Sequence, residues 1–394
     1  MNEYHAFLEK KISERYPDLI RKNSWEAFKS SIRYVQGSFE CIDDFKKLGM
    51  VLREIDETNK VVSYKIFYMA ISPDQYELVI NGIKVLQKEK FCHKKLNKVV
   101  VEKPFGKDLR SFESLNKKIL SVFEEKSVYR IDHYLGKDTI RNILYVRSLN
   151  PLLRNLCCDA FIKRIDVHAF EAIGVGNRGS YFDAFGQLKD MVQSHLLQVF
   201  ALSTIELDKS IPETLISGKM PVLSKRKAEV ISKLYVRDIV KDCIRAQYGS
   251  GVVEGKRVTS YRNEKDVSPN SQTETYVWIK AVLDLPAWRQ TEINFRTGKA
   301  LRQKQTEVVF YIGAPATENI NVVKFRLQPN EGMSLSLYVK SPNDMALQPV
   351  ELSFDYRSSF TSLLSDEYEN ILLDVIRSDR SSFISSEELV ASWR

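Results

Sequence analysis

The chain has 394 residues, a formal net charge of +8 at pH 7, 43% hydrophobic residues and five cysteines. This length suffices for two domains with their own cores. No apolar run approaches the roughly 20 residues that a membrane-spanning helix needs, and the first residues lack the pattern of a secretory signal. We therefore expect a cytoplasmic protein without a membrane partner.

The cysteines and the charge narrow the class of protein further. No C-x-x-C pair occurs, so we expect no metal site and no disulfide framework. The neighbours Cys157 and Cys158 are expected to be reduced and buried. The positive charge suits a phosphorylated ligand, nucleic acid or an acidic surface. The densest basic run, residues 88–98, contains no nucleic-acid motif, so we interpret it as solvated and expect no nucleic-acid partner.

The first part of the chain predicts an α/β fold. A mostly helical pattern covers residues 1–60, and it is followed by a strand at 66–71, a helix at 75–87, a strand at 99–101 and a helix at 109–123. Alternating strands and helices indicate a parallel sheet, in which a ligand binds beyond the carboxyl ends of the strands. Ser72-Pro73 and Glu102-Lys103-Pro104 follow the two strands there.

After residue 137 the pattern changes to period two. Alternating strands are predicted at 165–171, 276–285, 306–312, 322–328 and 333–339, with covering helices at 190–202 and 366–376. Such a pattern is typical of a mainly antiparallel sheet. The predicted fold class is α/β followed by α+β. A partial Rossmann-type parallel-sheet domain spans 1–137, and a larger domain with a mainly antiparallel sheet and covering helices spans 138–394.

The segment Asp132 to Lys137 concentrates polar chemistry in six positions. Asp132 accepts hydrogen bonds, and His133 can carry charge near neutral pH. Tyr134 offers a hydroxyl and Lys137 a compact positive charge. This combination indicates a site for a small, phosphorylated anion. A helix start with solvated charges is the alternative that spacing alone leaves open.

Five segments in order make the chain similar to the glucose-6-phosphate dehydrogenase family. They are EKPFG at 102–106, DHYLGKD at 132–138 (the family has DHYLGKE), KDMVQSHLLQ at 189–198 (the family has RDxxQNHLLQ), GKAL at 298–301 and QPNE at 328–331. The resemblance runs from about Phe39 to the C-terminus. It implies a dinucleotide-binding domain followed by a β+α domain that also forms the contact between subunits.

The resemblance implies a reaction and a set of site residues. The reaction is oxidation of glucose 6-phosphate to 6-phosphogluconolactone with NADP, the first oxidative step of the pentose phosphate pathway, in a homodimer or homotetramer. His195 matches the general base, for which an imidazole has a suitable pKa, and Asp132 matches the carboxylate that orients it. The matched substrate residues are Lys103, His133, Tyr134, Lys137, Glu171, Asp190, Lys299, Lys304 and Gln328, and the expected cofactor contacts are Ser72, Pro73, Glu102, Lys103 and Pro104.

Two glycine patterns bear on the cofactor. Residues 174–179 satisfy G-x-G-x-x-G, but the strand before them alternates and no acidic strand end follows, so we predict a structural turn. Family members also begin with a strand and a GASGDLAKKK turn that holds the pyrophosphate. The glycines before residue 100 are Gly37, Gly49 and Gly82, too far apart for such a turn. We expect the chain to start after the first two strands of its nucleotide domain.

The chain departs from the family pattern at three site positions. Asp138 replaces glutamate, Lys189 replaces arginine and Ser194 replaces asparagine. Of these, the change at Lys189 would remove any bidentate ion pair. A second, structural NADP site known in some members is not expected, because most of its residues are replaced.

Two alternatives remain open from the sequence. The Glu-Lys-Pro motif alone would also fit a sugar oxidoreductase of the glucose-fructose oxidoreductase type, although the cations of the Asp132 to Lys137 segment favour a phosphorylated substrate. The missing glycine turn would fit a shortened, inactive relative, or a gene-model fragment, that binds sugar phosphate or pairs with a full-length subunit. The preference between NADP and NAD stays open as well.

Overall fold

The computed structural model describes residues 2–20, 23–156, 161–217, 221–313, 320–361 and 366–394. Cys157 and Cys158 lie outside these residues. The chain divides into two compact units, one made of 1–99 and 117–127 and the other of 100–116 and 128–394. This division reflects spatial compactness, and the domain boundary expected after residue 137 stays a prediction.

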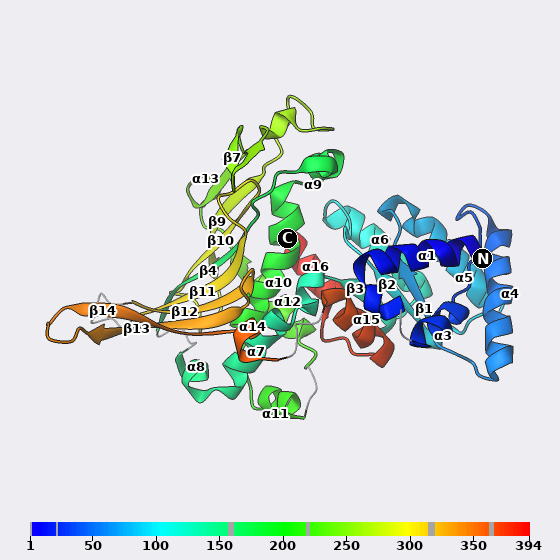
Figure 1. Cartoon of the computed structure of the whole chain (residues 1–394), viewed down its shortest axis with the longest axis horizontal. Helices are drawn as coiled ribbons and strands as arrows, with labels where there is room; N and C mark the ends of the chain where they lie inside the picture. The colour runs from blue at the N-terminus through cyan, green and yellow to red at the C-terminus, as the bar shows by residue number, and fades with distance from the viewer. Residues whose placement is uncertain (1, 21–22, 157–160, 218–220, 314–319, 362–365) are drawn as a thin grey trace. The chain divides into compact units, whose positions relative to one another are not determined.

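The first unit begins with helices, as the sequence predicts. They are α1 (Asn2–Arg15), α2 (Pro17–Ile20), α3 (Asn23–Ser31) and α4 (Ile42–Asn59), followed by β1 (Lys65–Met69) and α5 (Tyr76–Lys88) (Figure 1). The apolar face of α5 buries Ile80, Ile83 and Leu86. Phe45 of α4 lies directly over Gly82, where any side chain would collide with its ring. This close approach explains why a glycine is tolerated inside α5.

The smaller sheet follows the predicted strand–helix alternation. Its order is β1, β2 (Asn97–Val101), β3 (Val128–Ile131) and β15 (Phe383–Ile384), and α5 and α6 (Leu109–Val122) connect the first three strands. Strands joined by helical crossovers run parallel, whereas β15 pairs with β3 antiparallel. Every residue of β2 and β3 is buried, as central parallel strands require. The chain leaves β2 at Glu102 and leaves β3 at Asp132.

The larger sheet lies in the second unit. Within the described residues its order is β14 (Leu347–Asp355), β13 (Gly332–Lys340), β12 (Ile320–Gln328), β11 (Gln305–Gly313), β4 (Ile162–Phe170), β10 (Glu292–Gly298), β9 (Tyr276–Leu283) and β5 (Leu234–Tyr235), and β6 (Cys243–Ala246) also pairs with β9. Its pairs are antiparallel except for β4 with β10. The mainly antiparallel sheet is therefore confirmed. The edge strand β14 was not predicted from the sequence, because Pro349 and polar residues interrupt its alternation of apolar and polar residues.

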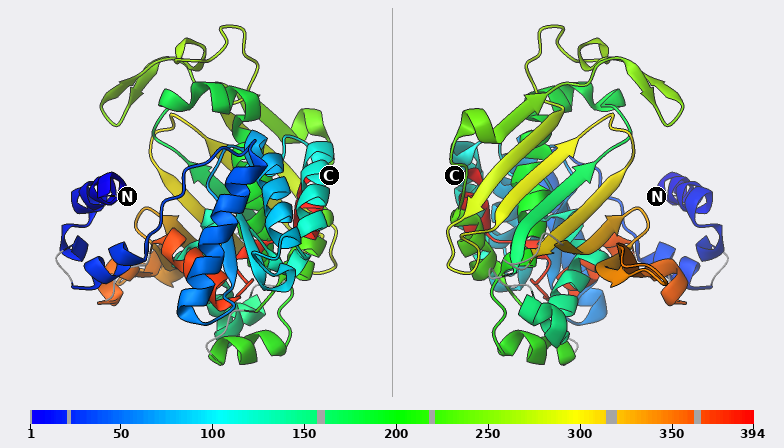
Figure 2. Two further views of the ribbon diagram at one scale, coloured as in Figure 1. Left: turned by 90° about the vertical axis from the view of Figure 1, so that its right-hand side faces the viewer. Right: turned by 90° about the vertical axis from the view of Figure 1, so that its left-hand side faces the viewer.

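Helices cover one face of the larger sheet, and its other face is bare among the described residues (Figure 2). The helices of this unit are α7 (Asp138–Leu149), α8 (Pro151–Leu156), α9 (Gly179–Gln187), α10 (Leu197–Thr204), α11 (Ser210–Ile216), α12 (Ser224–Ser232), α13 (Ile239–Asp242), α14 (Tyr356–Ser359), α15 (Glu367–Arg377) and α16 (Ser386–Trp393). All of α10 is buried, and its Phe200 ring meets Phe295 of β10 at 5.3 Å. The other helix predicted to cover this sheet, at 366–376, forms as α15, but it packs mainly against the segment after β3 and not against the larger sheet.

The segment before α10 departs from the predicted α-helix. Leu188–Leu196 forms a π-helix, η6, which continues into α10. A π-helix is wider than an α-helix, and short π segments are frequent at functional sites. None of the described helices combines the length and apolarity that crossing a membrane requires.

Candidate active site

The carboxyl end of β3 presents the first site residues. Asp132 caps the short helix η4 (His133–Gly136) by accepting a hydrogen bond from the Tyr134 amide at 3.0 Å. Such a cap satisfies a backbone donor that the helix leaves free. The capped turn fixes the direction of the His133 and Tyr134 side chains, while Asp132 itself is wholly buried.

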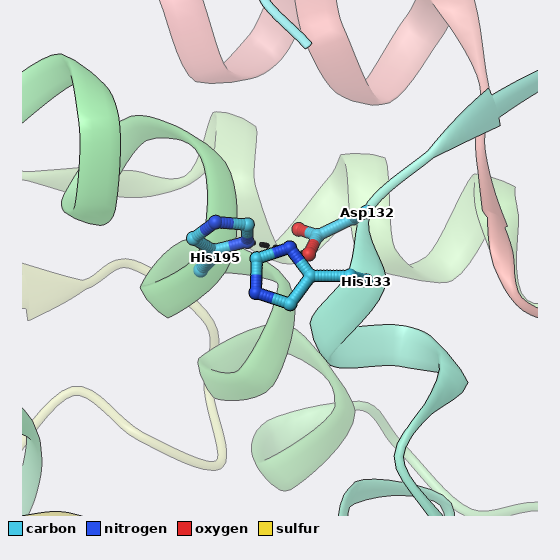
Figure 3. Close-up of side chains that lie close together, drawn as sticks. All are labelled: Asp132, His133 and His195. Atoms are coloured by element: carbon cyan, nitrogen blue, oxygen red, sulfur yellow. Dashed lines mark hydrogen bonds and ion pairs between the residues drawn. The ribbon is translucent and has the colours of Figure 1, made fainter. Parts of the chain in front are cut away.

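His195 of η6 meets this turn. Its Nδ1 lies 2.5 Å from Asp132 Oδ1, and its side chain is only 3% exposed (Figure 3). The ring stacks on Tyr134 with centroids 4.4 Å apart and meets His133 edge-on at 4.5 Å. Because the Asp132 carboxylate accepts a hydrogen bond from the Nδ1–H group, the other nitrogen, Nε2, is the one available as a base.

The ammonium group of Lys103, which follows β2, lies at hydrogen-bond distance from that nitrogen. Its Nζ lies 2.9 Å from His195 Nε2, and it also donates to the Asp190 carbonyl at 2.8 Å, to Asp190 Oδ1 at 3.2 Å and to Ser194 Oγ at 3.1 Å. An ammonium group only donates hydrogen bonds. Nε2 must therefore be unprotonated here, which is the form that a general base needs.

Burial and neighbouring charges set the protonation of this cluster. Burial lowers the pKa of His195, the Asp132 charge opposes this, and Lys103 lowers it further, so the net shift is downward. Burial lowers the pKa of His133 to about 3, with a further contribution from His195. Burial would raise the pKa of Asp132, but His195 reverses this and the pKa falls well below its usual range. Two neutral imidazoles therefore face an ionised carboxylate.

His195 and Lys103 open onto a cavity of ≈ 530 Å³ in the second unit. The predicted residues that line it are Glu102, Lys103, His133, Tyr134, Glu171, Asp190, His195, Lys299, Lys304 and Gln328. Lys299 Nζ donates to Glu171 Oε2 at 2.6 Å, so a cation and a carboxylate are held side by side. This volume and this lining suit a small polar ligand with several hydroxyls and an anionic group.

Other predicted site residues lie outside the cavity lining. Asp132 stands behind His195, and Lys137 pairs with Glu367 of α15 at 3.5 Å. Pro104 lines a smaller adjoining cavity. Ser72 and Pro73 belong to the first unit, and their contact with a cofactor stays a prediction.

Sequence reasoning missed seven residues of the lining. Ile131, Ala169 and Met191 are apolar, whereas Arg178, Tyr181, Thr306 and Tyr368 carry polar groups. Arg178 and Tyr181 lie in and just after the glycine-rich turn that we interpreted as structural. That interpretation agrees with the packing, since a side chain on Gly179 would lie 1.9 Å from the Lys265 carbonyl. Arg178, the basic residue inside the turn, was the signal that could have identified the turn as part of an anion-binding site.

The cluster also has the spacing of metal ligands. One ligand atom from each of Asp132, His133 and His195 lies within 4.8 Å of the others. Two ammonium groups, those of Lys103 and Lys137, act on His133 and oppose a cation there. The expectation of a metal-free site stays a prediction.

Fold and site together define a class of enzyme with a Rossmann-like sheet, a larger mainly antiparallel sheet and a histidine–aspartate pair, in which Asp132 follows β3 of the smaller sheet and His195 lies in η6. Two family models match the chain, "Glucose-6-phosphate dehydrogenase, NAD binding domain" over residues 1–142 and "Glucose-6-phosphate dehydrogenase, C-terminal domain" over 144–394. The chain therefore belongs to the glucose-6-phosphate dehydrogenase family.

Individual relatives agree with this membership. The glucose-6-phosphate 1-dehydrogenase of Chlamydia muridarum is 33% identical over 94% of this chain and 74% of its own length, and that of Mycolicibacterium smegmatis is 33% identical over 96% and 76%. A solved glucose-6-phosphate dehydrogenase in complex with glucose 6-phosphate superposes with a TM-score of 0.87, at 28% identity over 99% of this chain and 80% of that one. The enzyme from Mycobacterium avium superposes with a TM-score of 0.78, at 26% identity over 98% and 78%.

The described residues can be compared with the two parts of a dinucleotide that they would have to bind, the nicotinamide ring and the pyrophosphate. Beside Pro104, the adjoining cavity is lined by Phe105, Tyr181, Phe185 and Trp393, whose faces suit a flat nicotinamide ring. Its volume is only ≈ 20 Å³, which is room for about one water molecule. A pyrophosphate needs backbone N–H donors from a glycine-rich turn or a helix start. After β1 the chain offers instead Ser72, whose hydroxyl bonds to Asp74, and Pro73, which has no N–H. The side chains near Pro104 therefore suit a nicotinamide in their chemistry but not in the space they leave, and the turn after β1 forms no pyrophosphate cradle.

Proposed function

We propose that the chain oxidises glucose 6-phosphate to 6-phosphogluconolactone, with NADP as the hydride acceptor. The observation that carries the proposal is His195, held between Asp132 and Lys103 at the wall of a polar cavity. Family membership supports the substrate, because a solved relative is described as a complex with glucose 6-phosphate. A nicotinamide, when bound, supplies the hydride acceptor.

The protein groups then have distinct tasks. His195 Nε2 takes the proton of the anomeric hydroxyl as its O–H bond breaks, after Lys103 has moved from Nε2 to the substrate oxygen. Asp132 stabilises the resulting imidazolium and keeps its orientation. Glu171 and Asp190 accept hydrogen bonds from sugar hydroxyls. As the carbon–hydrogen electron pair leaves, the anomeric carbon becomes the lactone carbonyl.

The remaining predicted substrate residues surround the sugar phosphate. His133, Tyr134 and Lys137 bind the phosphate group, in line with the density of donors after β3. Lys299, Lys304 and Gln328 lie around the rest of the cavity and contact the sugar or the phosphate.

The test is the absorbance of reduced nicotinamide with purified chain, glucose 6-phosphate and NADP or NAD. Wild-type chain should turn over, and His195→Ala should lower kcat by about 10²- to 10⁴-fold, the usual value of a positioned base. His93→Ala is the matched control, because it removes an exposed imidazole outside the cavity lining. Equal turnover of His195→Ala and wild type would refute the assignment.

A second function, binding of glucose 6-phosphate without oxidation, is favoured by the turn after β1. Asp74 stands in the first helical turn there, where a carboxylate repels the phosphates that a helix start otherwise attracts. Isothermal titration calorimetry separates the two functions. A folded chain that binds glucose 6-phosphate but shows no turnover with either nucleotide supports the second one.

We further propose a cytoplasmic homodimer or homotetramer that assembles through the larger sheet. The support is apolar surface on β14, where Val350 is 43% and Leu352 56% exposed, because such patches favour association. Analytical ultracentrifugation of the wild type and of Leu352→Glu would test it. A variant that sediments like the wild type would argue against this interface.

A further inference from the structure

One ion pair near the cavity joins a predicted phosphate ligand to a residue with no predicted role. Lys137 Nζ lies 3.5 Å from Glu367 Oε1, and the two side chains are 18% and 30% exposed. Lys137 also lies 5.9 Å above the Tyr134 ring, which lines the cavity. The residue after Glu367, Tyr368, lines the cavity as well. The pair therefore borders the space where a phosphate would bind.

The backbone of Glu367 is fixed beside Lys137. Asn370 Nδ2 donates to the Gly136 carbonyl at 3.0 Å and to Asp138 Oδ1 at 3.1 Å, which ties α15 to both sides of Lys137. The packing is so close that a side chain on Gly136 would lie 2.6 Å from the Glu367 carbonyl oxygen. The carboxylate can rotate away from Lys137, but its backbone stays in place.

This pair differs in kind from the other lysine–carboxylate pairs at the cavity. Lys103 contacts Asp190 and Lys299 contacts Glu171, and both carboxylates can accept hydrogen bonds from hydroxyl groups of a sugar. The dianion of a phosphate monoester, the form in which a sugar phosphate carries the group, has no such proton to offer. Its arrival takes Lys137 away from Glu367 and leaves two anions close together, which repel each other.

We propose that Glu367 is an internal competitor of the substrate phosphate for Lys137 and so weakens the binding of phosphorylated ligands. The inference rests on the proposed function, which makes Lys137 a phosphate ligand. In the free chain Glu367 holds the ammonium group. In the bound chain Lys137 turns to the phosphate, and the Glu367 carboxylate turns toward solvent. Affinity for the phosphate group is therefore lower than the cations of the site alone would allow.

Isothermal titration calorimetry with glucose 6-phosphate tests the proposal without a nucleotide. Glu367→Gln should lower the Kd about threefold, within the range known for partly exposed ion pairs. Inorganic phosphate, the second probe, should gain in the same direction but less, because it keeps a hydrogen that can donate to the Glu367 carboxylate. Glu369→Gln is the matched control, since it removes the same charge from an exposed position in the same helical turn and should leave both Kd values unchanged.

The outcomes separate the inference from the function on which it rests. Lys137→Ala should weaken both ligands, and unchanged binding in that variant would remove Lys137 from the phosphate site. If Lys137→Ala weakens binding while Glu367→Gln has no effect or also weakens it, the competitor role is refuted and the proposed function stands. A chain that binds inorganic phosphate but not glucose 6-phosphate would refute the proposed substrate, and the phosphate series would still decide the role of Glu367.

Discussion

At the residue scale, the chemistry depends on which nitrogen of His195 carries the proton. Asp132→Asn tests this, because an amide can donate to Nδ1 and so move the proton to Nε2, which then is no longer a base. We expect kcat to fall about 10²- to 10⁴-fold. KM for glucose 6-phosphate should change little, since Asp132 does not line the cavity. Steady-state kinetics checks both values, and a drop of less than about threefold would contradict the role.

Ser194 offers a second test at this scale. Its hydroxyl donates to the Asp190 carbonyl at 2.7 Å and accepts from Lys103 at 3.1 Å, so it helps to hold the ammonium group on the base. Ser194→Ala should loosen Lys103 and raise the pKa of His195, because Lys103 is one cause of the lowered pKa. The acid limb of kcat/KM, where the base becomes protonated, should then move to higher pH.

Ser203→Ala is the control for this change. Its hydroxyl makes the same kind of bond, to the Val199 carbonyl at 2.8 Å in α10, without contact to Lys103. Its pH profile should match the wild type. If both serine variants shift the profile equally, the effect of Ser194 is structural and not exerted through Lys103.

The same residues show how far the sequence could predict the site. The motif around Asp132 and the helix with His195 were paired through the family resemblance, and the structure places their side chains in contact. The partner of Lys137 was not predictable, because Glu367 is distant in the chain and lies in a helix without a motif. Thr306 was missed for a related reason, since a threonine in an alternating strand carries no signal of its own.

At the element scale, a buried ion pair joins two helices of the second unit. Lys227 of α12 lies 2.8 Å from Glu388 of α16, and both side chains are at most 1% exposed. Lys227→Met should lower the free energy of unfolding by about 3–5 kcal/mol, because it leaves a buried charge without its partner. Urea unfolding would measure the loss.

The double variant Lys227→Met/Glu388→Gln tests the reason for that loss. Glutamine removes the charge but can still accept the hydrogen bond from the Ser385 amide that caps α16. Stability should therefore return toward the wild-type value. Lys227 also donates to Gln198 Oε1 at 3.0 Å, and both variants lose this bond. A double variant as unstable as Lys227→Met alone would show that the unpaired charge is not the cause, and would assign the loss to packing and to this hydrogen bond.

Helices and strands were predicted correctly where apolar residues recur with a regular period. They were missed or assigned the wrong type where this period is weak or shared by two structures. The helix at 75–87 and the strand at 322–328 are confirmed within a few residues, since each buries a regular apolar pattern. The π-helix of 188–196 has the composition of an ordinary amphipathic helix. Its side chains contact Lys103 and Asp132, which are distant in the chain, and local sequence does not encode such contacts.

At the scale of the whole molecule, the buried histidines predict acid sensitivity. The pKa of His133, about 3, and that of His195 lie below the ordinary value. Below about pH 6.5 the unfolded chain therefore binds protons that the folded chain does not, and stability falls as pH falls. His133 alone should reduce the free energy of unfolding by about 2 kcal/mol between pH 7 and pH 5.

Urea unfolding of the wild type and of His133→Gln at both pH values checks this sign. The variant should lose less stability on acidification than the wild type. Asp132 adds a separate loss at lower pH, because its lowered pKa stabilises the fold only while the carboxylate is ionised. Equal losses in the two proteins would contradict the burial of a neutral His133.

The most direct measurement is a crystal structure of this chain with glucose 6-phosphate bound. It should place the anomeric oxygen within hydrogen-bond distance of His195 Nε2 and the phosphate on His133, Tyr134 and Lys137, with Lys103 moved off the imidazole. A phosphate seated instead at Arg178 and Lys304, with the anomeric carbon away from His195, would contradict both the base and the orientation of the sugar.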